Sequence, residues 1–264
     1  MIPRKIVQAL VTVLFFIFLA FWIYPLLNLT LLSFSTKTYT VEFTLRNYIS
    51  LLSSPRYLNY LKNSFIVALG SAAIQIPVCL PAGYELARHK SKVIAFANRF
   101  FPFSLAIPWT VILVSVLIYY LRIGLYDTLI GLIFHHSAFS APFVAWIYST
   151  FIRSLPKDIE EAAQLDGCGK ARLIFQITLP LIAPGLIGAF VWVFINVWNT
   201  FIVAAFLIES EENIVFAQAL YNALTYIMSG GMLNFAYAAT VIFITPPMIL
   251  FIIFRKWIEQ ILIY

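Results

Sequence analysis

The sequence predicts an all-α, polytopic membrane protein, and three properties of the chain lead to this fold class. Hydrophobic residues make up 62% of the 264 residues and charged residues 11%, against about 25% charged residues in soluble globular domains. The mean hydropathy is +0.93. The apolar residues gather in long windows, and a helix of about 20 apolar residues crosses the ~30 Å hydrocarbon layer. We therefore expect a single transmembrane domain over residues 1–264.

Six windows have the length and composition of membrane-spanning helices. They cover residues 7–32, 61–86, 100–121, 128–152, 185–208 and 235–254. The first window follows Arg4 and Lys5, is longer than the signal-peptide core of about 7–15 residues, and shows no small-x-small cleavage site. We interpret it as a retained anchor, which gives about six transmembrane helices.

Prolines interrupt three of these windows. The pairs are Pro77 with Pro81, Pro102 with Pro108, and Pro246 with Pro247. Each proline removes a backbone donor and is expected to bend its helix. Broken helices in a bilayer are tolerated where protein or a water-filled cavity satisfies the freed carbonyl groups. Kinks that only improve packing explain any single proline equally well.

The distribution of Lys and Arg predicts the orientation. If the N-terminus is inside, the cytoplasmic set is Arg4, Lys5, Arg88, Lys90, Lys92, Arg99, Arg153, Lys157, Lys170, Arg172, Arg255 and Lys256. The outer set is the smaller one, with Lys37, Arg46, Arg56, Lys62 and Arg122. Because basic residues are enriched in cytoplasmic loops, both termini are expected in the cytoplasm of a cell-membrane protein. The net charge of +6 then reflects this bias and contact with anionic lipid, not nucleic acid.

The sequence lacks the patterns of an enzyme or a proton-driven carrier. The only acidic residue within the windows is Glu85, near the cytoplasmic end of the second. Intramembrane carboxylates are kept where protons or cations are carried. The chain has no phosphate-binding loop, no nucleophile turn and no H-E-x-x-H helix. We therefore expect no catalytic residues and no cofactor bound by this chain.

The histidines and cysteines do not form a metal site or a disulfide framework. His135 and His136 are adjacent, so on a helix they point about 100° apart and do not make the i, i+4 pair that binds metal. A polar break facing other helices or a water-filled path is the better interpretation. Cys79 lies inside the second window and Cys168 on the cytoplasmic side, so the two thiols cannot pair.

Residues 154–180 form a charged segment rich in small residues between two apolar windows. Ser154 can cap a helix, Pro156 suits its first turn, and Gly167 can end it in the left-handed conformation. Helices of this length, roughly 11 residues, are marginal in water, so the segment is expected to dock against something. An interfacial elbow whose acids only interact with the helix dipole is the alternative.

The segment resembles the EAA signature of binding-protein-dependent ABC importer permeases, Glu-Ala-Ala, three residues, Gly, nine residues, then Ile-x-Leu-Pro. The matching positions are Glu161, Ala162, Ala163, Gly167, Ile177, Leu179 and Pro180. The stretches "GYELAR" at 83–88, "IGLYDT" at 123–128 and "VWNTF" at 197–201 are similar to the sugar-type branch of that family. The resemblance covers about residues 45–255, and the end of the chain lacks the small, basic, Gly-rich tail of that branch.

The resemblance implies that segment 154–180 is a cytoplasmic coupling-helix elbow, which sits in a cleft on an ATP-hydrolysing subunit. Glu161 would pair with a basic residue of that subunit, while Ala162 and Ala163 would permit close approach. Gly167, after Asp166, would turn the chain. With the residues of the Ile-x-Leu-Pro stretch, these make up the predicted ATPase-coupling set.

The resemblance also implies the partners and the function. The partners would be a second homologous permease subunit, two nucleotide-binding ATPase subunits that hold ATP and Mg, and an extracytoplasmic solute-binding protein meeting the outer loop 209–234. The importer would move a sugar or polyol derivative into the cytoplasm by alternating access. The alternative is an ion-gradient-driven secondary carrier or channel, which needs no ATPase.

The translocation path is expected to include Asn196, Trp198 and Asn199 of the fifth window. Amides in a membrane span can line a route for a hydroxyl-rich solute. They can also serve as contacts between helices, worth about 0.6 kcal/mol on average. Trp rings near the ends of spans are commonly interfacial anchors, which is the alternative for Trp198.

Overall fold

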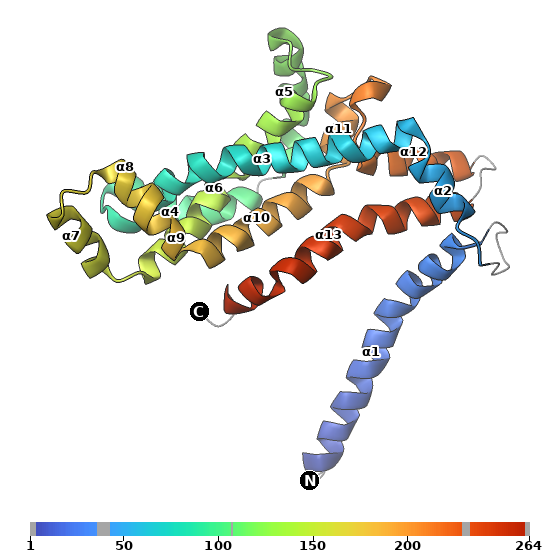
Figure 1. Cartoon of the computed structure of the whole chain (residues 1–264), viewed down its shortest axis with the longest axis horizontal. Helices are drawn as coiled ribbons and strands as arrows, with labels where there is room; N and C mark the ends of the chain where they lie inside the picture. The colour runs from blue at the N-terminus through green and yellow to red at the C-terminus, as the bar shows by residue number, and fades with distance from the viewer. Residues whose placement is uncertain (1–3, 36–42, 107, 229–232, 262–264) are drawn as a thin grey trace. The chain divides into compact units, whose positions relative to one another are not determined.

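The computed structural model describes residues 4–35, 43–106, 108–228 and 233–261, and within these ranges it contains helices and no strand (Figure 1). The all-α prediction is confirmed. The chain divides into two compact units, Met1–Leu58 with Leu220–Thr245, and Asn59–Ala219 with Pro246–Tyr264. The expectation of one domain over 1–264 stays a prediction.

The first unit is organised around buried amides at the end of α1. It contains α1 (Arg4–Ser33), α2 (Arg46–Leu52) and the start of α13 (Leu233–Ile261). The side-chain amide of Asn47 donates to the carbonyl oxygens of Ser33 and Ser35 at 3.0 and 2.8 Å. The amide of Asn234 donates to the carbonyl of Leu32 at 3.0 Å. These bonds satisfy carbonyl groups that the end of a helix leaves unpaired.

The second unit is built on the close packing of α3 (Pro55–Arg88) against α6 (Leu129–Ser154). A Cβ atom at Gly83 would lie 2.7 Å from the Tyr148 Cβ atom and 2.8 Å from the Ala145 carbonyl oxygen, so only glycine fits there. The Ser137 hydroxyl of α6 donates to the Ser71 carbonyl of α3 at 3.4 Å. Small and hydroxyl-bearing residues of this kind let membrane helices approach closely.

Four helical stretches of the described residues are long and apolar enough to cross a membrane, judged by length and composition. They are Lys5–Ser33, Pro55–Arg88, Leu129–Ser154 and Leu233–Trp257. They overlap the first, second, fourth and sixth predicted windows. A bent pair, Lys170–Leu181 with Ala183–Trp198, would count as a fifth span.

The third window, 100–121, is not one helix. It is divided between α4 (Lys92–Phe103) and α5 (Trp109–Ile123), with a single 3-10 turn at Ser104–Ala106. Pro108 has an extended backbone, with φ −66° and ψ 102°, and stands directly before α5. The extended backbone of Pro108 separates α4 from α5, so the helix breaks here and does not merely bend.

The fifth window, 185–208, is also divided. It contains α10 (Ala183–Trp198) and α11 (Ile202–Leu207), and no helix covers residues 199–201. Ahead of α10, an arm runs through α8 (Lys170–Arg172), a π-helical stretch (Leu173–Thr178) and α9 (Leu179–Leu181). The arm meets α10 at an angle of 82°. Pro184 has no N–H for the carbonyl four residues earlier, which accounts for the bend.

The connection from α11 to α12 (Phe216–Met228) includes a 3-10 turn, Glu211–Asn213, and is braced from two sides. The Asn63 side-chain amide of α3 donates to the carbonyl groups of Glu212 and Ile214 at 2.7 and 2.9 Å. The Asp127 carboxylate accepts the backbone N–H groups of Glu209 and Ser210, each at 3.0 Å. The position of this connection is therefore fixed by α3 and by the turn between α5 and α6.

Candidate functional site

The charged segment forms a separate short helix, α7 (Lys157–Leu165), of nine residues. Gly167 has φ +77°, the left-handed conformation that the sequence predicts for it. The structure corrects the predicted start of this helix. Ser154 belongs to α6 and donates its hydroxyl to the Phe151 carbonyl at 2.7 Å, while Pro156 occupies the cap position of α7.

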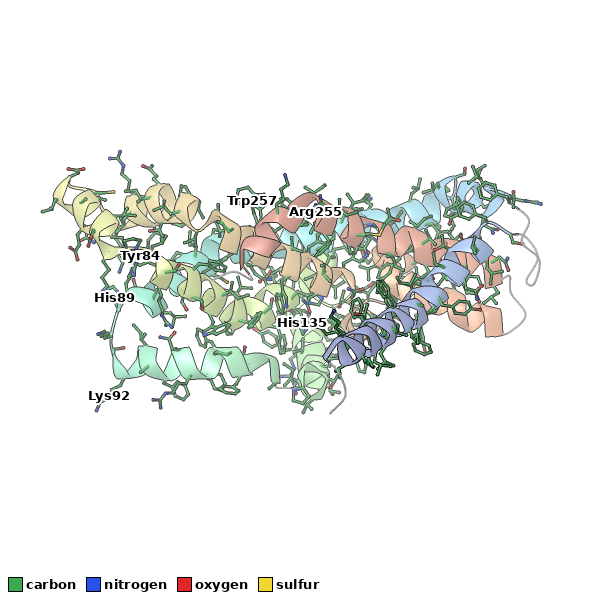
Figure 2. The ribbon with its side chains drawn as sticks, turned by 90° about the horizontal axis from the view of Figure 1, so that it is seen from below. Tyr84, His89, Lys92, His135, Arg255 and Trp257 are labelled. Atoms are coloured by element: carbon green, nitrogen blue, oxygen red, sulfur yellow. The ribbon has the colours of Figure 1, made fainter. Side chains whose placement is uncertain are left out.

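Glu160 attaches α7 to the end of α3. Its side chain is buried, and Oε1 lies 2.6 Å from Arg88 Nη2 and 2.8 Å from Arg88 Nε. The Tyr84 hydroxyl donates to Oε2 at 2.8 Å. Arg88 Nη2 also donates to the Leu155 carbonyl at 3.0 Å. Because both charges are buried and each has several partners, the pair fixes α7 against the end of α3 marked by Tyr84 in Figure 2.

The sequence interpretation missed this contact because it did not single out Glu160 among the acidic residues of segment 154–180. The signal lies in "GYELAR", where Tyr84 and Arg88 are four residues apart and share one face of a helix. In "EEAA", Glu160 and Glu161 are adjacent and point about 100° apart on a helix, so the two carboxylates cannot share one direction.

The opposite face of α7 is open. Glu161, Ala162 and Asp166 are exposed, and the Leu165 side chain is 89% exposed. Ala163, predicted to border the ATPase together with Ala162, is buried within this chain instead. The face available for docking therefore combines a carboxylate with a small and a large apolar side chain.

The arm that follows α7 is tied to the same end of α3. Lys170 forms an ion pair with Glu85, whose carboxylate also contacts His89 Nδ1 at 2.7 Å. In the predicted Ile-x-Leu-Pro stretch, Ile177 and Leu179 are half-buried and Pro180 is exposed. The arm thus packs through its apolar side chains and is held to α3 at its start.

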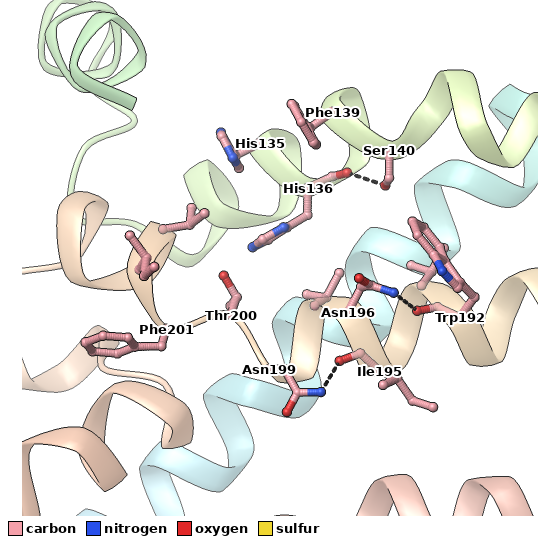
Figure 3. A pocket seen from close by; sticks show the side chains of 14 residues that line it. His135, His136, Phe139, Ser140, Trp192, Ile195, Asn196, Asn199, Thr200 and Phe201 are labelled. Carbon is pink, nitrogen blue, oxygen red and sulfur yellow. Dashed lines mark hydrogen bonds between the residues drawn. The ribbon is translucent and has the colours of Figure 1, made fainter. Parts of the chain in front are cut away.

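A cavity of about 560 Å³ lies between α6 and the break that separates α10 from α11 (Figure 3). Asn196 and Asn199, predicted for the translocation path, both line it. Their side-chain N–H groups donate to the carbonyls of Trp192 and Ile195 at 2.9 and 2.8 Å. These bonds hold the two amides against their own helix.

Trp198, the third residue predicted for the path, is placed elsewhere. Its side chain is 1% exposed and does not line the cavity. The indole stacks on Phe194, with ring centroids 5.4 Å apart, and meets Phe65 edge-on at 4.8 Å. In this structure Trp198 is a core residue that packs α10 against α3.

The cavity brings in residues that the sequence did not connect. His135 and His136 of α6 line it together with Thr200, which lies in the break after α10. The sequence identified the histidines as a polar interruption but gave no reason to place them opposite residues about 60 positions later. Among the described residues no group of three or more His, Cys, Asp or Glu could hold a metal ion.

Elbow and cavity both lie within a stretch that matches a known family. Residues 75–263 match the family described as "Binding-protein-dependent transport system inner membrane component". The chain belongs to this family. As such an inner membrane component, it is a multi-pass membrane protein and a permease subunit of an ABC importer, and ATP hydrolysis belongs to separate subunits.

Individual transport proteins resemble this chain along most of its length. It is 30% identical over 217 residues to a probable ABC transporter permease protein of Pyrococcus horikoshii, covering 81% of this chain and 78% of that protein. It is 26% identical over 265 residues to the maltodextrin transport system permease protein MalD of Streptococcus pneumoniae, covering 97% and 93%. Its fold matches a bacterial ABC transporter involved in the import of the acidic polysaccharide alginate, with a TM-score of 0.81 and 19% identity over 97% and 98% of the chains.

Proposed function

We propose that this permease subunit moves a sugar or polyol derivative into the cytoplasm by alternating access. The similarity to a maltodextrin permease and to an alginate importer supports a carbohydrate solute. The subunit would work with a second, homologous permease, and Asn196 and Asn199 would border the path. Trp198 would act behind the path by packing α10.

The observation that carries the coupling role is the two-sided construction of α7. Glu160 anchors the helix inward to Arg88, and Glu161 and Leu165 remain exposed on the other side. A helix of nine residues does not persist alone in water, so an inward anchor with an open outer face fits docking into a second protein. We assign that protein as the ATPase subunit, with Glu161 paired to one of its basic residues and Ala162 at the point of closest approach.

The remaining coupling residues have supporting roles. Gly167, in its left-handed conformation after Asp166, would return the chain from α7 to the arm. Ile177, Leu179 and Pro180 would transmit the movement from the arm to α10. The inward-facing Ala163 would keep α7 close to the rest of the permease.

The orientation follows from placing α7 on the cytoplasmic side. Asn63, which holds the 211–214 connection, and Arg88, which holds α7, are 25 residues apart in α3. That separation spans about 37 Å along a helix, more than the ~30 Å hydrocarbon layer. The connection after α11 would therefore lie outside the cytoplasm, where it would meet the solute-binding protein, and both termini would be cytoplasmic.

ATP and Mg would be bound by two ATPase subunits and not by this chain. Closure of those subunits would push on α7 and shift the permease pair from an inward to an outward opening. The drive would come from the different affinities of the partners for the two states, since a ligand shifts an equilibrium only by its differential affinity.

The test uses the full importer complex in lipid vesicles with its binding protein. Glu161→Lys and Gly167→Leu should leave the complex inserted, yet separate ATP hydrolysis from uptake, because the first reverses a charge at the contact and the second strains a left-handed turn. Normal coupled uptake by both variants would contradict the coupling role. Transport by the isolated chain, driven by an ion gradient, would support a secondary carrier instead.

A further inference from the structure

The cavity between α6 and the α10–α11 break has the size of a small-molecule site and no charged lining. Its volume of about 560 Å³ lies within the range of about 300–1,000 Å³ typical of ligand pockets. None of its lining residues is Asp, Glu, Lys or Arg. The polar groups that it offers are amide, hydroxyl, imidazole and indole groups.

Two polar atoms beside the cavity are buried without a hydrogen-bond partner among the described residues. They are His136 Nε2 from α6 and Thr200 Oγ1 from the break between α10 and α11. Figure 3 shows the imidazole of His136 extending from α6 toward Thr200. Buried polar groups in folded proteins are nearly always paired, so each unpaired atom needs a specific explanation.

The backbone carbonyl of His136 is tied down by two side chains. The Ser140 hydroxyl donates to the His136 carbonyl at 2.7 Å, and the Gln75 side-chain amide of α3 donates to the same oxygen at 3.4 Å. Thr200 lies where the helix is interrupted, and irregular backbone at membrane depth is tolerated where it lines a cavity. The two residues therefore line the cavity from different elements, His136 from α6 and Thr200 from the break after α10.

We propose that His136 and Thr200 are contact residues for an uncharged polyhydroxy solute that occupies this cavity. The inference rests on the proposed function and deepens it by assigning residues and a solute class. Both atoms are covered in this conformation, so the solute would reach them when α6 and the α10–α11 break separate during alternating access. The two unpaired atoms would then form hydrogen bonds with the solute, which no described residue supplies in the present conformation.

The chemistry of the walls selects a neutral sugar over an acidic one. A neutral imidazole donates from one nitrogen and accepts at the other, and a hydroxyl does both, which matches the hydroxyl groups of a sugar. Trp192, Phe139 and Phe201 add aromatic faces for the apolar face of a sugar ring. A carboxylate moved into this cavity would lose its water without meeting a cation, which is strongly unfavourable.

The experiment measures uptake by the full complex and its binding protein in vesicles, with radiolabelled maltotriose as the neutral probe and radiolabelled trigalacturonate as the acidic one. We expect uptake of maltotriose and none of trigalacturonate above background. Thr200→Val and His136→Phe should each reduce maltotriose uptake about three- to tenfold, the effect of one lost hydrogen bond. ATPase stimulation by the binding protein should stay unchanged in both variants.

Two controls separate a solute contact from a folding defect. Thr245→Val makes the same change at a threonine whose hydroxyl bonds within α13, to Val241 at 2.7 Å, and should leave uptake unchanged. Thr200→Val removes an unpaired hydroxyl, so the thermal unfolding temperature of the complex should not fall.

Three outcomes would overturn the inference. They are uptake of trigalacturonate at a rate equal to maltotriose, unchanged maltotriose uptake in both variants, and uptake of neither probe by a complex whose ATPase is still stimulated by the binding protein. The last result would reject the solute class and leave the coupling role standing. A complex that shows neither stimulation nor uptake would reject the proposed function itself.

Discussion

Glu160 of α7 and Arg88 of α3 form a buried ion pair, with Glu160 Oε1 2.6 Å from Arg88 Nη2 and both side chains less than one tenth exposed. The neighbouring residue, Glu161, is exposed. Two adjacent glutamates of one short helix thus have different roles, one inside the permease and one at its surface.

Replacing Glu160 should destabilise the protein strongly. In Glu160→Gln the guanidinium of Arg88 stays buried without its carboxylate, a change that costs about 3–5 kcal/mol at buried pairs. We expect a clear fall in the thermal unfolding temperature of the purified protein. Glu161→Gln is the matched control, because its side chain is exposed and the same substitution should leave that temperature within error. Equal unfolding temperatures for the two variants would show that the buried pair does not hold α7.

The hydroxyl of Tyr84 should contribute to the same contact, by a smaller amount. Tyr84→Phe removes one hydrogen bond to a buried carboxylate, at 2.8 Å, and should cost about 1.5–3 kcal/mol. A double-mutant cycle of Tyr84→Phe with Glu160→Gln measures the coupling through the free energies of unfolding. Strict additivity of the two changes would mean that the hydroxyl does not act through Glu160.

The close approach of α3 and α6 should make Gly83 intolerant of a side chain. In Gly83→Ala the new Cβ atom would lie 2.7 Å from the Tyr148 Cβ atom, and overpacking of this kind typically costs about 1–3 kcal/mol. The control is Gly169→Ala, because no atom lies within 4 Å of the position of its Cβ. Thermal unfolding should separate the two variants, and equal stability would indicate that α3 and α6 are further apart than described.

The hydrogen bonds that the Asp127 carboxylate accepts from residues 209 and 210 should make the 209–213 connection sensitive to acid. Burial opposes ionisation of the Asp127 carboxyl, but hydrogen bonds from Ser210, Glu209 and Asn213 outweigh it and lower its pKa. A lowered folded-state pKa contributes stability above the unfolded value of about 3.9, and this stability is lost as pH falls through the folded value. Hydrogen exchange of residues 209–213 should therefore increase only in strongly acidic buffer.

The control for this pH dependence is Asp127→Asn. Asp127 has φ +56°, and asparagine tolerates this left-handed conformation about as well as aspartate does. The variant should keep the fold of the turn, exchange faster than the wild type at neutral pH, and show no acid-dependent step at 209–213. An unchanged acid step in the variant would assign the titration to another group.

Sequence reasoning predicted features that depend on local chemistry. The left-handed turn at Gly167 was readable because glycine after a short helix has one common conformation there. The division of the 185–208 window could not be predicted from the sequence, because residues 199–201 include no proline or glycine to mark a break. After the break, α11 packs against both α5 and α6, and a periodic pattern does not record such contacts.

The same limit explains the site residues. Glu161 stood out in the sequence because its neighbours repeat a known spacing, whereas Glu160 acquires its role only when α3 brings Arg88 beside it. Likewise, Asn196 was readable as a polar residue in an apolar window, but its position opposite His136 depends on how α6 and α10 pack. Contacts between distant parts of the chain are tertiary information.

Helix α3 contacts other segments near both of its ends. Near its C-terminal end, Arg88 and Glu85 form ion pairs with α7 and with the arm that follows it. Nearer its N-terminal end, Asn63 donates to the backbone carbonyls of Glu212 and Ile214. The helix continues through Pro77 and Pro81 between these contacts. Under the proposed coupling, a displacement of α7 would be carried to the 211–214 connection by this one continuous helix, and a break at its prolines would weaken the transmission while leaving both sets of contacts in place.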